Sequence, residues 1–355
     1  CFGTLETTPK SETGVYKLTF GSSSSGRPGG PGGGGPGGGG SSSTSFAAGT
    51  WTISGLNISV TNPTSYTSGW NYNIVDATKK TIELTRYLSH EQEIGKLYIP
   101  ETIDGYTVVG FANFQSNTDL FNTANDLINY KYMYLPATFE YFGNNSMRNT
   151  VFEYINGDCS AVKVGDYAFY KNYLVEFNIP VSSIGISSFE QSKNLKEISL
   201  SKDINNIPTN AFKDSPLLEK VTSDDSTWIE TVGDSAFENC YNLNTINLSH
   251  IATSIGNKAF MHCHNIYEAD LNWTVETIGE SAFAYTNIES IEIPVSVETI
   301  EDSTFYHCSR LKNIELGHAK TVEDNAFSYT NINELVIYNV NSVTSISETA
   351  FNYVP

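Results

Sequence analysis

The sequence predicts an α/β solenoid, a leucine-rich repeat ladder in which each unit of about 23 residues gives one short strand plus one short helix or turn, with a small β cap region at its N-terminal end. Two observations carry this prediction. The motif Ile-Gly-x-x-Ala-Phe recurs, followed each time by Leu-x-x-Ile-x-Leu or a close variant. The Phe of this motif recurs every 20 to 25 residues, at Phe169, Phe189, Phe212, Phe237, Phe260, Phe283, Phe305, Phe327 and Phe351.

Each repeat has two parts, shown clearly by residues 275–294. The first part, Ile278 to Phe283, has the pattern of a turn that enters a short helix, with the small Ala282 where neighbouring coils must approach. The second part alternates apolar and polar residues, as a half-buried strand does. The same alternation is found at 195–200, 243–248 and 311–316. One unit cannot bury both its Phe and its strand residues, so we expect consecutive units to stack.

Composition and residue patterning predict four segments along the chain. Residues 1–20 form an N-terminal tether or strand, because 14–20 alternates and could pair with the β region that follows. Residues 21–45 are almost wholly Gly, Ser and Pro, which predicts a linker that cannot bury enough apolar surface to order itself. Residues 46–93 form the β cap region. Residues 94–355 form the solenoid.

Short alternating runs predict the strands of the cap region, at 50–53, 57–60, 71–75 and 80–85. The solenoid begins weakly, with a first repeat at 97–114 and with Met147 in place of the Phe of the next repeat. Trp51 and Trp70 in the cap region are candidates for stacking on a sugar, although a Trp in such a pattern is more often part of the core.

The repeats resemble the BspA-like leucine-rich repeats of bacterial surface proteins. The pattern Ile-Gly-x-x-Ala-Phe-x-x-Cys-x-x-Leu-x-x-Ile-x-Ile-Pro is nearly complete at 232–248, with Cys240, and at 300–316, with Cys308. The resemblance implies a secreted or surface-attached binding or adhesion module on the outside of a bacterial cell, and it implies no enzyme. The sequence also contains no Gly-x-Ser-x-Gly and no His-Glu-x-x-His motif.

The charge balance narrows the choice of partner. The chain has 20 Lys and Arg against 39 Asp and Glu, a formal net charge of −19. This argues against nucleic acid, because phosphate binding needs clustered basic residues. An acidic surface instead suits solubility outside the cell and favours cationic partners. The resemblance implies that the partner is a host or neighbouring-cell surface protein or glycan. No apolar run is long enough to span a membrane.

Cys1 is a candidate lipidation site. Lipoprotein maturation leaves a lipid-bearing Cys as the first residue, and a tether of small residues commonly follows it. We therefore expect Cys1 to anchor the repeats at the cell envelope. The alternative is that the numbered chain begins at this residue only because it has been truncated, with no lipid on it.

Four carboxylates are the candidate ligand-binding residues. The strands of successive repeats are expected to lie in parallel, about 4.8 Å apart, so equivalent side chains line up. This alignment gathers Glu268, Asp270, Glu292 and Glu315 on one face. Like charges so close repel one another, so the face should raise some carboxyl pKa values or attract a cation: a basic protein patch or, more weakly, calcium. The alternative is a solvated acidic face without a ligand.

The cysteines and histidines give no cofactor or metal site. Cys240, Cys263 and Cys308 each follow a repeat Phe by three residues, so we expect them to pack as small buried hydrophobes and not to form disulfides. His262 and His264 flank Cys263, but no further ligand is fixed by spacing.

Three functions remain open at this point. The first is a monomeric cell-surface binding or adhesion module that recognises protein or glycan through the concave strand face of the solenoid. The second is a structural or self-assembling surface subunit, which would show a concentration-dependent mass. The third is a glycan-binding β domain at 46–93, carried on the repeats as a stalk.

Overall fold

The computed structural model describes residues 17–20, 49–53, 56–61, 69–88, 95–115, 120–121, 130–223, 227–337 and 343–355, the first three ranges as backbone only. The chain divides into two compact units, Cys1–Thr67 and Ser68–Pro355. The predicted linker at 21–45 and the candidate lipidation site Cys1 lie outside the described residues.

The first unit contains a three-stranded antiparallel sheet. Its strands are β1 (Lys17–Phe20), β2 (Gly49–Ile53) and β3 (Leu56–Thr61), in the order β1-β3-β2. The strand expected within 14–20 therefore pairs with the β region that follows, with Lys17 opposite Thr61.

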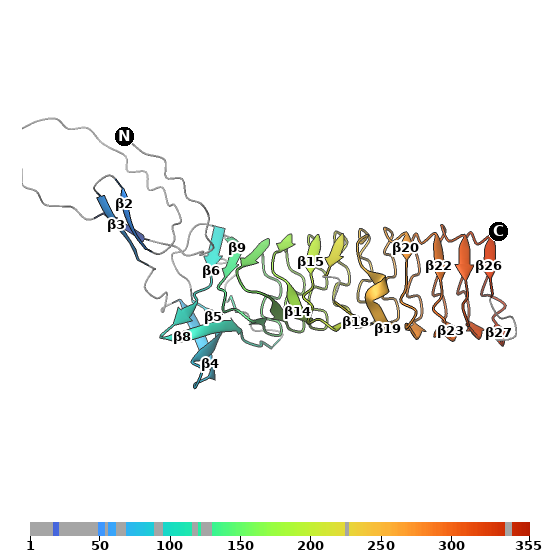
Figure 1. Ribbon diagram of the computed structural model, residues 1–355, viewed down its shortest axis with the longest axis horizontal. Helices are drawn as coiled ribbons and strands as arrows, with labels where there is room; N and C mark the ends of the chain where they lie inside the picture. The colour runs from blue at the N-terminus through green and yellow to red at the C-terminus, as the bar shows by residue number, and fades with distance from the viewer. Residues whose placement is uncertain are drawn as a thin grey trace, which may run out of the picture. The chain divides into compact units, whose positions relative to one another are not determined.

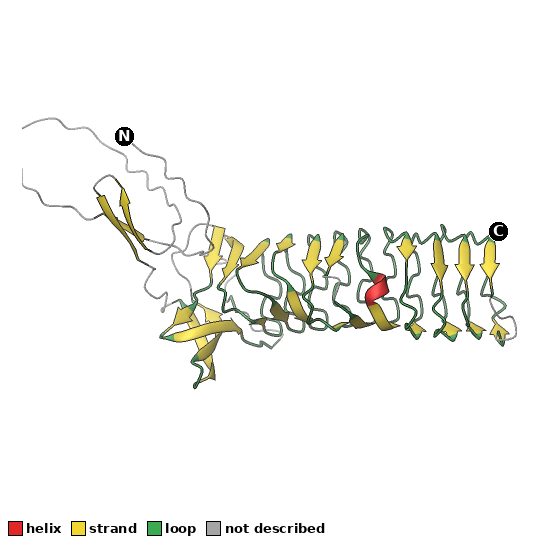
Figure 2. Ribbon diagram, viewed as in Figure 1, coloured by secondary structure: helices red, strands yellow, loops and turns green. Residues whose placement is uncertain are grey.

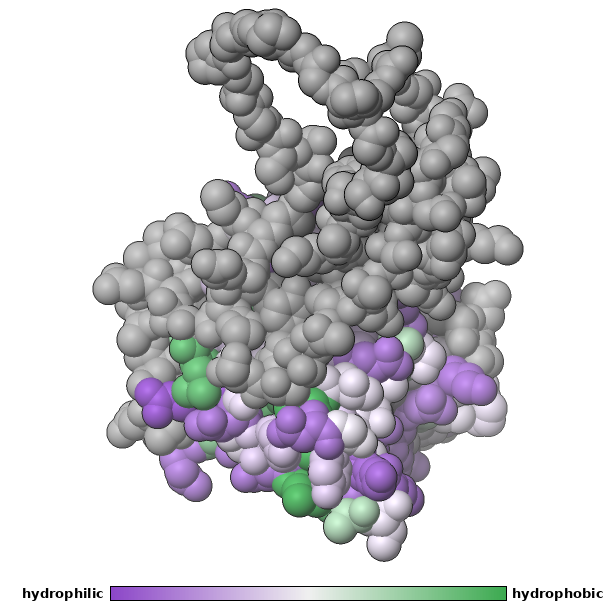
Figure 3. Space-filling model, turned by 90° about the vertical axis from the view of Figure 1, so that its left-hand side faces the viewer, coloured by the Kyte–Doolittle hydropathy of each residue, from purple (hydrophilic) through white to green (hydrophobic). Residues whose placement is uncertain are grey.

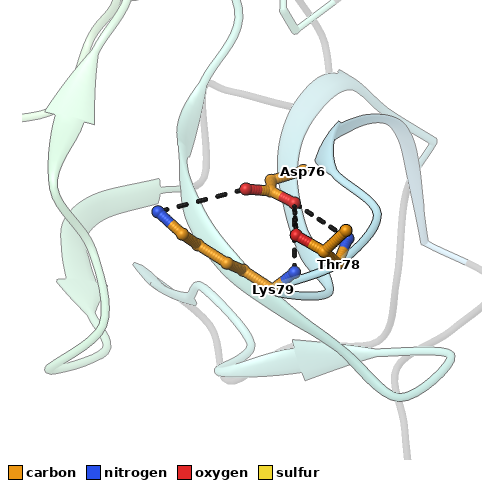
Figure 4. Close-up of polar contacts among 3 residues, drawn as sticks. All are labelled: Asp76, Thr78 and Lys79. Carbon is orange, nitrogen blue, oxygen red and sulfur yellow. Dashed lines mark hydrogen bonds and ion pairs between the residues drawn. The ribbon is translucent and has the colours of Figure 1, made fainter.

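The second unit begins with an antiparallel hairpin, β4 (Trp70–Asp76) and β5 (Thr81–Tyr87). Asp76 builds its turn: one carboxylate oxygen accepts hydrogen bonds from the Thr78 amide (2.8 Å), the Thr78 hydroxyl (2.6 Å) and the Lys79 amide (3.1 Å) (Figure 4). These bonds, the one from the Thr78 hydroxyl first, lower the pKa of Asp76. The predicted region 46–93 is thus divided between the two units, with β2 and β3 in the first and the β4–β5 hairpin in the second.

The solenoid continues from this hairpin. β5 pairs in parallel with β8 (Tyr106–Phe111), against which the short β7 (Thr102–Ile103) folds back in antiparallel fashion. From here the coils follow one another in a row, with one set of strands along one edge of the row and a second set along the opposite edge (Figures 1 and 2).

The first strand row corresponds to the predicted Leu-x-x-Ile-x-Leu strands. Its members are β6 (Gly95–Tyr98), β9 (Tyr130–Leu135), β11 (Tyr154–Gly157), β13 (Glu176–Phe177), β15 (Glu197–Ser199), β17 (Lys220–Thr222), β20 (Glu268–Ala269), β22 (Ser290–Glu292), β24 (Asn313–Glu315) and β26 (Glu334–Val336). The expected strand at 243–248 is wrong: only Thr245 bridges to Lys220, and a 3-10 helix, η1 (Leu248–His250), ends the segment.

The second strand row was not predicted. It lies just before the Gly position of each motif and consists of β8, β10 (Tyr141–Phe142), β12 (Val162–Val164), β14 (Val181–Ile184), β16 (Asn206–Ile207), β18 (Ile229–Val232), β19 (Ile251–Ile255), β21 (Thr277–Ile278), β23 (Thr299–Ile300), β25 (Thr321–Val322) and β27 (Ser345–Ile346). β-Branched pairs such as Thr277-Ile278 and Thr299-Ile300 are the sequence signal, since such residues favour strands.

The Ala-Phe part of each coil is a turn and not a helix. In each coil from Met147 to Phe327, the residues two before and two after the repeat Phe (or Met) have φ between 53° and 64°. A helix needs consecutive right-handed residues, so this alternation excludes it. The flat turns instead bond to the next coil: the amides of Lys258, Phe260 and His262 donate to carbonyls 22 residues on, at 2.8 to 2.9 Å.

The core is a column of stacked Phe rings inside these turns. From Phe169 to Phe351 neighbouring ring centroids are 5.2 to 5.8 Å apart and the rings are within 17° of parallel. Met147, fully buried, takes the Phe position as predicted. The Gly of the motif lets the coils approach: a Cβ on Gly256 would lie 2.6 Å from the Asp234 amide nitrogen.

Candidate functional site

The four predicted carboxylates lie on the parallel sheet β20-β22-β24-β26. Glu292 is directly opposite Glu315 on the neighbouring strand. Glu268 is opposite Ser290, and the same column continues through Asn313 to Glu334. Asp270 follows β20 at the position that Glu292 occupies in β22, because Ala269 is opposite Ile291. The structure therefore brings the four residues together, in two adjacent columns, and places a further carboxylate, Glu334, in the column of Glu268.

These two columns form what we call the acidic face: Glu268, Ser290, Asn313 and Glu334 in one, and Asp270, Glu292, Glu315 and Val336 in the other. Glu268, Asp270, Glu292 and Glu334 are exposed and Glu315 is half-buried. The buried residues between the columns, such as Ile291 and Ile314, hold the strands against the core. Neither column contains a Lys or Arg.

Arg310, a basic residue beside the acidic face, already has a carboxylate and an aromatic ring as partners. Arg310 is 3.1 Å from Glu289 and lies over the Tyr267 ring, 5.3 Å from its centroid. Within the described part of the chain, no three His, Cys, Asp or Glu side chains are grouped so that they could hold a metal ion. The arrangement can offer several carboxylates at a spacing of about 4.8 Å to a cationic surface.

The same strand row has a different character in the early coils. There the outward positions hold Tyr98 stacked on Tyr134 (4.8 Å) and Tyr132 stacked on Tyr154 (4.7 Å). The outward side chains thus change from aromatic at the start of the row to carboxylate at its end.

The repeat cysteines are fully buried with free thiols. Each is near the backbone carbonyl of the preceding coil's Phe: Cys240 near Phe212 (3.1 Å), Cys263 near Phe237 (3.2 Å) and Cys308 near Phe283 (3.1 Å). Burial raises the pKa of Cys308 to about 11 and also raises the pKa of Cys240 and Cys263. They pack as predicted, and they additionally donate S–H hydrogen bonds. Other coils place Ser192, Ser215, Thr286 or Thr330 at this position.

A second ring column lies outside the Phe column. The outer ring column consists of His262, Tyr285, His307, Tyr329 and Tyr353, each two residues after a repeat Phe. Their centroids are 4.4 to 5.0 Å apart and neighbouring rings are within 21° of parallel. Burial, then His264, lowers the pKa of His262. His262 therefore belongs to this column, while Cys263 points into the core.

The tryptophans fall in two classes. Trp70 is buried, with its ring centroid 4.8 Å from that of Tyr87, so it is part of the core, as such a Trp more often is, and it does not fit the other candidate role of stacking on a sugar. The side chain of Trp51 lies outside the described residues.

Among the described residues visible in Figure 3, hydrophilic and neutral surface predominates and apolar surface forms small separate patches. Trp228 and Trp273, which sequence reasoning missed, are 53% and 72% exposed.

This geometry defines a leucine-rich repeat solenoid, and the comparisons identify its family. The BspA type leucine rich repeat region matches residues 118–230 and 230–355, with six copies. The chain belongs to this family. No curated protein matches it. No helix among the described residues is both long and apolar enough to cross a membrane.

Three solved structures are similar to this chain, and the first shares its repeat architecture. A leucine-rich repeat protein from Bacteroides ovatus is 20% identical, with a TM-score of 0.55, over 81% of this chain and 79% of that one. This likeness shows the fold. The pneumococcal vaccine antigen PcpA is 16% identical over 79% of this chain and 85% of that one, with a TM-score of 0.40. A leucine rich cell surface protein from Faecalibacterium prausnitzii is 17% identical over 79% and 97%, with a TM-score of 0.36.

Proposed function

We propose that this chain is a non-enzymatic binding module, exposed at a bacterial cell surface, which attaches to a positively charged protein surface through the acidic face. The observation that carries the proposal is the register of β20, β22 and β24, which sets Glu292 opposite Glu315 and aligns Asp270 beside them. Family membership supports the surface location, because BspA-like repeats are typical of bacterial surface proteins.

Electrostatics gives the reason for a cationic partner. Carboxylates on neighbouring strands repel one another, and the strands cannot move apart because their backbones are paired. A cationic partner relieves this repulsion on binding, so part of the binding energy comes from strain already present in the free face. The net charge of −19 adds long-range attraction, which speeds the encounter.

The test replaces the four predicted carboxylates with their amides, as the variant E268Q/D270N/E292Q/E315Q. The probe is a fluorescein-labelled nona-arginine peptide, titrated with the full chain and followed by anisotropy. We expect affinity to fall about tenfold or more in the variant, and to fall with added salt for the native chain, since exposed charges are screened.

A matched control has the same charge change elsewhere. E230Q/E280Q/D302N/E348Q also removes three Glu and one Asp charge, all at exposed positions outside the acidic face. If both variants lose the same affinity, net charge alone attracts the peptide and the acidic face is no site. Repeating the titration with calcium in place of the peptide tests the weaker metal alternative, and a concentration series in mass measurement tests self-association.

A further inference from the structure

A strip of apolar and aromatic side chains, three exposed and one half-buried, crosses four consecutive coils and reaches the acidic face at its later end. Trp228 aligns with His250, because Ile229 is opposite Ile251 on the neighbouring strand. The two rings stack, with centroids 5.2 Å apart and 29° between their planes. Trp273 follows on the next coil, where the side-chain amide of its neighbour Asn272 donates to the carbonyl of Ser249, the residue before His250, at 2.8 Å.

The next coil continues this strip with an apolar side chain. Val295 follows Trp273 by 22 residues and is 51% exposed, and the Ser296 hydroxyl donates to the Trp273 carbonyl at 3.3 Å. We call Trp228, His250, Trp273 and Val295 the tryptophan strip.

Trp273 is held outward by a turn whose backbone is fixed. The Val275 amide donates to the Asn272 carbonyl (3.1 Å), and the Asn272 side chain accepts from the Thr274 amide (2.9 Å). The Thr274 hydroxyl donates to the Ala252 carbonyl of the preceding coil (2.6 Å). A bulky ring at the tip of such a turn contributes nothing to the core, yet exposes a large apolar area to water. The free-energy cost of exposing this ring to water is offset when a partner covers the ring.

The strip adjoins the acidic face at its later two residues, Trp273 and Val295. Asp270 precedes Trp273 by three residues, and Glu292 precedes Val295 by three. One strand end and one turn separate each carboxylate from its neighbour in the strip. A partner side chain lying across this border therefore has Asp270 beside the Trp273 ring on one coil, and Glu292 beside the apolar Val295 on the next.

We propose that the tryptophan strip and the adjoining carboxylates Asp270 and Glu292 form a docking site for an extended, arginine-rich segment of the partner protein. This inference rests on the proposed function and names the chemistry of its partner. Arginine fits both halves of the site: its planar guanidinium stacks on an indole face and pairs with a carboxylate through its edge. Lysine pairs with the carboxylate but stacks less well, so the strip gives a preference for arginine over lysine.

The test compares labelled nona-arginine with nona-lysine, using the full chain and the variant W228A/W273A. We expect the native chain to bind the arginine peptide about three- to fivefold more tightly than the lysine peptide. In the variant this preference should disappear, and affinity for the arginine peptide should fall about tenfold. Y173A, at another exposed aromatic residue of the solenoid, is the control and should change neither value.

The outcomes separate the two proposals. If W228A/W273A keeps both affinity and arginine preference while the amide variant loses binding, the strip inference is overturned and the acidic face stands. If neither variant loses affinity, both are overturned. If the native chain instead binds a neutral oligosaccharide such as cellohexaose and W228A/W273A loses it with peptide binding unchanged, the strip is a glycan site and this inference is wrong. Circular dichroism of each variant checks folding.

Discussion

The Phe column and the outer ring column are two stacks of aromatic rings built on the same turns, only two residues apart. Their spacing is similar, 5.2 to 5.8 Å against 4.4 to 5.0 Å between neighbouring centroids. Their burial differs. Phe260, Phe283, Phe305 and Phe327 are fully buried, whereas all five rings of the outer column retain solvent contact.

This comparison shows that the stacking of the rings and their contribution to stability have different causes. Stacking follows from the hydrogen-bonded spacing of the coils, so any rings at equivalent positions are brought face to face. Burial decides how much the stack stabilises the fold, because the hydrophobic contribution scales with the apolar area removed from water. The composition reflects this: the inner column is Phe from Phe169 on, while the outer position also holds Lys171, Gln191, Asp214 and Asn239.

The largest expected effect on stability comes from removing one aromatic ring, first from the Phe column and then from the outer ring column. F283A should lower the free energy of unfolding by about 3–5 kcal/mol, because it leaves a cavity between Phe260 and Phe305. Y285A, two residues on, should cost about 0.5–1.5 kcal/mol, since it removes stacking but little burial. Urea unfolding of both variants measures the difference. Equal losses would mean that the outer column is as important for stability as the core, contrary to the comparison.

An intermediate effect tests the hydrogen bonds that link each repeat cysteine to the preceding coil. C263A removes the S–H donor to the Phe237 carbonyl and should cost about 1 kcal/mol. C263S should retain most of that stability, because Ser192 and Ser215 are buried at the same position in other coils. Thermal unfolding of the two variants compares them. If C263A is as stable as C263S, the thiol acts only by filling space.

The smallest effect concerns the turn that carries both columns at Phe305. Burial, then Glu323 and Glu280, raises the pKa of Glu301 above its usual 4.5. The folded state therefore favours the protonated acid, and stability is lost as pH rises from the unfolded pKa through the folded one. E301Q should raise the melting temperature at pH 7 and change it little near pH 3. E280Q, which removes one of the repelling charges, should give a smaller rise. An E301Q effect that is the same at both pH values would point to packing and not to charge.

The sequence predicted the repeat, the buried Phe positions and Met147 as a substitute, because a solenoid must bury the same side chain in each coil. It also predicted that Glu268, Asp270, Glu292 and Glu315 share one face, since parallel strands align equivalent residues. It did not predict the second strand row, whose segments of two to six residues are too short to show a clear alternation. Trp228 and Trp273 were missed for another reason: the stacking of Trp228 on His250 follows only from the register of β18 and β19, and the exposure of Trp273 follows only from its turn.

Which side chains are inside was therefore determined by the sequence alone, through a Phe position that occurs nine times at a nearly constant spacing. How the chain passes from one strand row to the other was decided by tertiary structure. The residues that flank each Phe, such as Ser281 and Tyr285, adopt positive φ although neither is Gly. They do so because the amides of Phe283 and Tyr285 then donate to carbonyls of the next coil, at 3.0 and 2.8 Å. Only the stacked neighbour supplies those partners, and an isolated repeat would have no reason to prefer this turn to a helix.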